Sequence, residues 1–253
     1  MLRSGNPALK DSTFLDLTSG AVVTRDGQAM TLNGTVNKTG LLLLLAVITA
    51  AYAWNSIEIT EAGISGNYPL FLFGGLIGGL VFALATIFKQ TWAPVTAPLY
   101  ALFEGLFLGA VSAVYDARFD GIVLQAVMLT MGTLFALLFA YRTGIIRATE
   151  NFKLGVVAAT GGVALIYLAT IVLGLFGINI PYIHESGLIG IGFSLVVVVI
   201  AALNLVLDFD FIETGVERGA PKHMEWYAAF GLMVTLVWLY LEFLRLLSKL
   251  QSR

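Results

Sequence analysis

The sequence contains no cysteine and few charged residues. The absence of cysteine excludes disulfide bonds, thiolate metal sites and cysteine nucleophiles, although it does not identify the redox compartment. Charged residues make up 12% of the 253 residues, whereas about 25% is usual in soluble proteins. Hydrophobic residues make up 58%. This composition argues against a soluble globular fold.

The chain also lacks a surplus of basic residues. Its 14 Lys and Arg residues are outnumbered by 16 Asp and Glu residues, which gives a formal net charge of -2. Proteins that bind nucleic acid through its phosphates need a basic surface, so we expect no nucleic-acid partner. The two histidines, His184 and His223, fall in loops on opposite predicted faces, so a two-histidine metal site is not expected.

Long apolar runs dominate the chain after Lys38. About 20 apolar residues are enough for a helix to cross a hydrocarbon core about 30 Å thick, and the sequence has seven such runs. We therefore predict an all-α polytopic membrane protein with a polar cytoplasmic tail at 1–38 and a transmembrane domain at 39–253. No secretory signal is recognised in the tail, so the first span is expected to direct insertion. The predicted spans are 39–57, 68–88, 92–115, 121–141, 154–178, 187–208 and 225–246.

Basic residues in the connections predict the orientation, because Lys and Arg accumulate on the cytoplasmic side. The connections after the second, fourth and sixth spans hold Lys89, Arg142, Arg147, Lys153, Arg218 and Lys222, whereas those after the first, third and fifth hold only Arg118. This places the N-terminus in the cytoplasm. Seven crossings would put Arg245, Lys249 and Arg253 on the outer side, against the same rule. Either the last segment is re-entrant, or it crosses fully and these charges lie at the far interface.

Glycines gather in two of the predicted spans, and small residues let helix backbones approach closely. We expect them to serve packing rather than ligand binding. They are Gly74, Gly75, Gly78 and Gly79 in the second span, and Gly155, Gly161 and Gly162 in the fifth.

Glu104 lies halfway along the third predicted span, where it cannot readily reach either membrane surface. Ionisable residues inside a membrane are costly and often mark an ion or proton path. Glu104 is therefore a candidate for permeation or gating. The alternative is a neutral glutamic acid that forms hydrogen bonds between helices.

The end of the sixth span and the connection after it are acidic. Asp208 and Asp210 are about 200° apart around a helix, so only one can face the bundle interior if the helix continues. Glu213, Glu217 and Glu225 follow. Oxygen-rich clusters suit Ca²⁺, so Asp208 and Asp210 are candidate metal ligands, although the fixed spacing of an EF-hand is absent. A solvated loop with local ion pairs is the alternative.

Glu242, the acid in the last span, lies three residues before Arg245 and is a further candidate for the ion pathway or gate. It either reaches the membrane interface or pairs locally with Arg245. A structural role is favoured by that spacing.

Several segments together resemble a bacterial branch of the Bax inhibitor-1 family, also called the transmembrane Bax-inhibitor-motif family. The similarity covers essentially the whole chain, and the order and spacing of the segments are more specific than any one of them. The segments are 3–7 (RSGNP), 34–40 (GTVNKTG), 104–109 (EGLFLG), 203–213 (LNLVLDFDFIE), 225–227 (EWY) and 239–242 (LYLE).

The resemblance implies six helices around a central seventh and a pH-sensitive calcium leak through a bacterial inner membrane, with Ca²⁺ or H⁺ as the permeant ion and no bound cofactor. In the family, two aspartates share a proton and gate the pore. Asp208 matches the first, but the second falls near Thr235, so this chain lacks it. We hypothesise that Asp208 or Asp210 forms a cytoplasmic gate with Glu225, and that Glu104 lines the pathway.

Two other functions remain as alternatives. A non-transporting scaffold or regulator, of a membrane protease or of a stress response, needs no ion pathway and would bind a partner through its tail or loops. An intramembrane hydrolase could use Asp208, Asp210 and Glu104 to activate water, but the histidines are badly placed for a metal site, so we do not expect an enzyme.

Overall fold

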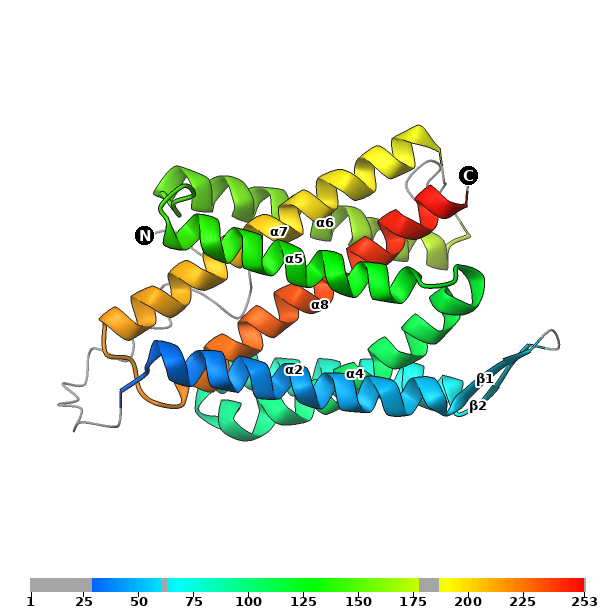
Figure 1. The fold of residues 1–253 in the computed structure, drawn as a ribbon, viewed down its shortest axis with the longest axis horizontal. Coiled ribbons are helices and arrows are strands. Elements are labelled where there is room, and N and C mark those ends of the chain that lie inside the picture. The colour runs from blue at the N-terminus through cyan, green and yellow to red at the C-terminus, as the bar shows by residue number, and fades with distance from the viewer. Residues whose placement is uncertain (1–28, 61–62, 178–186, 253) are drawn as a thin grey trace. The chain divides into compact units, whose positions relative to one another are not determined.

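The computed structural model describes residues 29–60, 63–177 and 187–252, and this part of the chain is almost wholly helical (Figure 1). Within these residues, seven helical segments are long and apolar enough to cross a membrane, the second of them made of η1 and α3 together, which confirms the predicted fold class. A π-helical turn η1 (Leu70–Gly74) leads into α3, and a short 3-10 turn η2 (Gln90–Trp92) precedes α4. The helices are α2 (Leu32–Asn55), α3 (Gly75–Phe88), α4 (Ala93–Arg118), α5 (Ile122–Arg142), α6 (Glu150–Leu175), α7 (Leu188–Glu217) and α8 (Met224–Gln251).

Two helices, α2 and α7, extend furthest beyond the predicted spans, because polar residues join their ends. α2 begins at Leu32 rather than at residue 39, since Thr31 caps it by accepting a hydrogen bond from the Gly34 amide. α7 continues to Glu217 rather than ending at Asp208. The connection between the last two spans is correspondingly short, and its acids Glu213 and Glu217 belong to α7.

A two-stranded hairpin follows α2 and was not predicted. Strand β1 (Ile57–Thr60) pairs antiparallel with β2 (Gly63–Gly66), with Ile57 opposite Gly66. Gly66 has a φ of 80°, a conformation that glycine adopts without strain. The alternating Ile57, Ile59 and Ile64 are the sequence signal for these strands.

The described residues form two compact units. α7 and α8 are each divided between the two units. The α2–α4 unit comprises residues 29–60, 63–121 and 211–234, and the α5–α6 unit comprises residues 122–177, 187–210 and 235–252.

In the α2–α4 unit, α2 and α4 run side by side (Figure 1) and glycines let their backbones approach closely. A Cβ atom on Gly105 of α4 would lie 2.3 Å from the Ala46 carbonyl oxygen, and one on Gly109 would lie 2.3 Å from that of Ala50. Gly75 of α3 is as close to α4, since its Cβ would lie 2.6 Å from the Phe107 nitrogen. Close packing was therefore correctly predicted for the second span.

In the α5–α6 unit, polar side chains join the helices. Asn204 of α7 donates a 2.8 Å hydrogen bond from Nδ2 to Oγ1 of Thr160 in α6. The packing prediction for Gly155, Gly161 and Gly162 is wrong for the described chain, because a Cβ on any of them would meet nothing within 4 Å.

α8 contacts the start of α7 through a lysine near its C-terminal end. Its first residue follows α7 by a short connection, and near its other end Lys249 donates to the Gly190 carbonyl oxygen (3.1 Å) and to Ser194 Oγ (2.8 Å), both in the first turns of α7. α8 is also the most buried span, with 72% of its apolar window buried against 44% or less in the others. The Lys249 contacts lie within the α5–α6 unit, and a full crossing by the last segment stays a prediction.

Candidate functional site

Glu104 lies in the middle of α4, on the side that faces α3. A Cβ atom on Gly79 of α3 would lie 2.8 Å from Glu104 Oε2, so the absence of a side chain at Gly79 makes room for the carboxylate. Its neighbour Gly105 packs against α2. Within the part of the chain that the structure describes, no side chain or backbone group donates a hydrogen bond to the Glu104 carboxylate.

Asp208 and Asp210 point to different surroundings, as the predicted continuation of the helix requires. Asp208 is fully buried. Asp210 is partly exposed, and its Oδ2 lies 2.6 Å from the ammonium group of Lys153 in the first turn of α6. Lys153 also lies 4.0 Å from Glu150. The α7 acids therefore include one buried carboxylate and one that is paired with a lysine.

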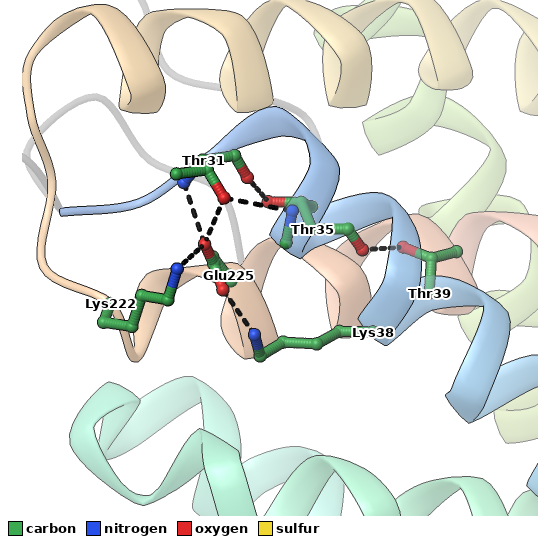
Figure 2. A network of polar contacts seen from close by, with 7 residues as sticks. Thr31, Thr35, Lys38, Thr39, Lys222 and Glu225 are labelled. Atoms are coloured by element: carbon green, nitrogen blue, oxygen red, sulfur yellow. Dashed lines mark hydrogen bonds and ion pairs between the residues drawn. The ribbon is translucent and has the colours of Figure 1, made fainter. Parts of the chain in front are cut away.

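Glu225, in the first turn of α8, is fully buried at the centre of a polar network (Figure 2). Its Oε1 accepts hydrogen bonds from the backbone amide and hydroxyl of Thr31, both at 2.8 Å, and lies 2.8 Å from the Lys222 ammonium. Its Oε2 accepts from Lys38. Both oxygens are thus engaged by groups of α2 and the α7–α8 connection.

Glu242 is buried near the end of α8 and forms the predicted local pair with Arg245, at 2.7 Å. The Tyr167 hydroxyl of α6 lies 2.9 and 3.1 Å from its two oxygens, and the Trp238 indole donates at 3.2 Å. Arg245 stacks over the Tyr167 ring, with its guanidinium carbon 5.1 Å from the ring centre. Tyr167 of α6 therefore contacts two α8 side chains, the Glu242 carboxylate and the Arg245 guanidinium, and so joins the two helices.

Two lysines that pair with the candidate carboxylates were not predicted from the sequence. Lys38 and Lys153 were read as loop or tail charges, but each reaches a carboxylate on a distant part of the chain. Their positions in the sequence do indicate that each needs a partner, because each lies next to or within an apolar run, where an unpaired charge is costly. Which acid each would find could not be inferred from one sequence.

His223 lies in the connection between α7 and α8. Its Nε2 is buried and has no hydrogen-bond partner within the described segments. Burial lowers the pKa of His223 below its ordinary value, because a charged imidazolium is poorly solvated there. His184 lies outside the described residues.

Metal binding receives no geometric support from the described part of the chain, where no group of three or more His, Asp or Glu side chains could hold an ion. The predicted Ca²⁺ ligation by Asp208 and Asp210 stays a prediction. So do the gate formed by Asp208 or Asp210 with Glu225 and the roles of Glu104 and Glu242 in an ion pathway. Thr235, where the second aspartate of the family is expected, is buried in α8.

Comparison with known proteins identifies one family. A model of the family described as "Bax inhibitor 1 like" matches residues 6–252, which is nearly the whole chain. No curated protein and no solved structure matches significantly.

Proposed function

Because the chain belongs to the Bax inhibitor 1 like family, we propose that it is a pH-sensitive calcium leak channel whose buried carboxylates control the passage of the ion. The orientation that follows from the basic connections has the N-terminus in the cytoplasm, and the membrane proposed is a bacterial inner membrane. The choice of Ca²⁺ as the ion and the pH sensitivity both rest on the family resemblance stated above.

The observation that carries this proposal is the position of Glu104. Its carboxylate lies mid-span, in space left open by Gly79, and no donor within the described residues occupies it. A carboxylate held without donors in a low-dielectric region has an unbalanced charge when ionised, and a passing cation can balance it. Glu104 is therefore assigned as a cation contact along the pathway.

Asp208 and Asp210 are assigned to the gate. Asp208 is buried in the C-terminal half of α7, and Asp210, about half a turn further along the helix, has the Lys153 ammonium beside it. A carboxylate changes its charge when it binds a proton, so a gate that contains one responds to pH. The oxygens of Glu225 and Glu242 are already engaged by lysine or arginine, and the gate proposed here does not require them.

The test is calcium flux into liposomes that contain the purified protein and a calcium-sensitive dye, measured across a range of pH. We expect a protein-dependent flux, reduced by Glu104→Gln and altered in its pH dependence by Asp208→Asn. Glu217→Gln is the matched control, because Glu217 is exposed at the end of α7 and its replacement removes the same charge.

Two results would count against the leak. Flux and pH profiles that Glu104→Gln and Asp208→Asn leave unchanged would remove these carboxylates from the mechanism. No flux above empty liposomes at any pH, from protein that is monodisperse and helical, would favour the scaffold or regulator instead.

A further inference from the structure

The start of α2 is fastened to the connection between α7 and α8. The Met30 amide donates a 2.6 Å hydrogen bond to the Ala220 carbonyl oxygen, and Ala29 pairs with Pro221 in an antiparallel bridge. Side chains of Thr31, Lys38 and Lys222 then converge on Glu225 (Figure 2). We call the two segments together, residues 29–38 and 220–225, the clasp.

Charge makes Glu225 the closing contact of the clasp. It is fully buried and lies between two ammonium groups, one from α2 and one from the connection. The Lys38 and Lys222 side chains are 19% and 48% exposed, so water can solvate them if the carboxylate is removed, but the contact that joins α2 to the connection is then lost. The Lys38 ammonium also lies 5.4 Å from the centre of the Trp226 ring, which adds a second contact across the clasp.

The clasp joins the elements that carry the proposed pathway. On one side, α2 is packed backbone to backbone against α4 at Gly105, the residue after Glu104. On the other side, residues 220–225 directly follow α7, which carries Asp208 and Asp210. A displacement of α2 from the connection would therefore move α4 or strain its packing, because close-packed helices transmit shifts rather than absorb them.

We propose that the clasp is a conformational latch: closed, it holds the leak at its low resting rate, and its release at Glu225 raises the flux. This inference rests on the proposed function for its flux measurement. The closure of the clasp itself can be measured independently of any transport.

The absence of cysteine in the sequence permits a direct test. Ala29→Cys and Pro221→Cys together place two thiols on residues that are paired across an antiparallel bridge. Such partners have Cα atoms roughly 4.5–5.5 Å apart, which lies within the range that a disulfide accepts. Oxidation should lock the clasp and reduction should release the lock.

The releasing variant is Glu225→Gln, with Glu217→Gln as its control of equal charge change. In the double-cysteine background we expect Glu225→Gln to slow disulfide formation by about tenfold, because the segments then meet less often. We expect the same variant to raise calcium flux severalfold when reduced, and oxidation to return the flux to the wild-type level. Lys38→Met is the second releasing variant, and it should act in the same direction.

Each outcome decides a separate point. Equal flux in the oxidised, reduced and Glu225→Gln proteins, with the wild type leaking, overturns the latch and leaves the leak standing. Disulfide formation that Glu225→Gln does not slow overturns Glu225 as the closing contact. No flux in any form overturns the leak and with it the latch, even where rapid cross-linking shows that the clasp is closed.

Discussion

Gly34 decides whether the Glu225 carboxylate can sit where it does. A Cβ atom at this position would lie 2.1 Å from Glu225 Oε1, and the carboxylate is held in place by four donor groups, so it cannot move away at little cost. Only glycine provides the space, although glycine is a poor helix former.

We predict that Gly34→Ala destabilises the protein by about 1–3 kcal/mol, as overpacking usually does. A loss of stability would be informative, because replacing glycine with alanine inside a helix otherwise raises the free energy of unfolding by up to about 1 kcal/mol. Gly40→Ala is the control in the same helix, where an added Cβ meets nothing within 4 Å. Thermal unfolding in detergent, followed by tryptophan fluorescence, should show Tm falling for Gly34→Ala and unchanged or higher for Gly40→Ala.

His223 gives the α7–α8 connection a dependence on pH. Its pKa is lowered by burial, so the folded protein binds a proton less readily than the unfolded chain does. In the unfolded chain His223 has the ordinary histidine pKa of about 6.5. Above that pH the neutral form costs no stability, and as pH falls below it the unfolded chain gains a proton that the folded protein resists, so stability is lost.

We therefore predict that wild-type Tm falls between pH 7.5 and pH 5 by more than that of His223→Gln, which cannot acquire this charge. Near pH 7.5 the Tm difference between the two proteins should no longer change with pH, because His223 is then neutral in both the folded and the unfolded chain. Parallel Tm profiles over the whole range would show that His223 does not take up a proton on unfolding.

At the scale of the element, the contact between α2 and α4 depends on two glycines. Gly105 and Gly109 are spaced four residues apart, so they lie on one face of α4, and both bring the backbone of α2 within contact distance. The Cβ atoms that they lack would overlap the Ala46 and Ala50 carbonyl oxygens. Backbone atoms at such a crossing cannot rotate away as a side chain can.

We predict that Gly105→Ala and Gly109→Ala each lower stability by about 1–3 kcal/mol through overpacking. Gly132→Ala in α5 serves as the control, since its Cβ would meet nothing within 4 Å. The prediction is contradicted if all three variants unfold at the wild-type temperature. That result would mean that α2 and α4 can move apart at no cost and that their close approach does not contribute to stability.

Sequence patterns located the spans because a bilayer demands long apolar helices, whatever their neighbours. They did not locate α2's true start, which depends on Thr31 as a cap and on Glu225 as a partner for Lys38, nearly two hundred residues away in the chain. The same limit applies to Lys153 and Asp210. Candidate acids could be read from their cost in a membrane, but their partners are a property of the folded chain.

At the scale of the whole molecule, the contacts test the number of crossings. Residues 29–38 bind residues 220–225, so the start of α2 and the end of α7 lie at the same membrane surface, which requires an even number of crossings between them. Six spans from α2 to α7 satisfy this requirement. It agrees with the positive-inside assignment, which places both segments in the cytoplasm.

α8 is long enough to carry the chain across a seventh time. Its 28 residues extend about 42 Å at 1.5 Å per residue, which exceeds a hydrocarbon core of about 30 Å. Two of the basic residues that oppose an outer C-terminus have partners, Arg245 with Glu242 and Lys249 with the start of α7. A seventh crossing would therefore place charges that are already paired or hydrogen-bonded at the far surface.

We predict that a cysteine at Ser252 is labelled from the opposite side of the membrane to a cysteine at Arg218. In sealed vesicles of known orientation, a membrane-impermeant maleimide should reach Ser252→Cys and Asp120→Cys from one side, and Arg218→Cys and Ala29→Cys from the other. No native cysteine competes for the reagent. Labelling of Ser252→Cys together with Arg218→Cys would make α8 re-entrant and would contradict the Lys249 contacts with the first turns of α7, because those turns lie a full membrane crossing away from Arg218.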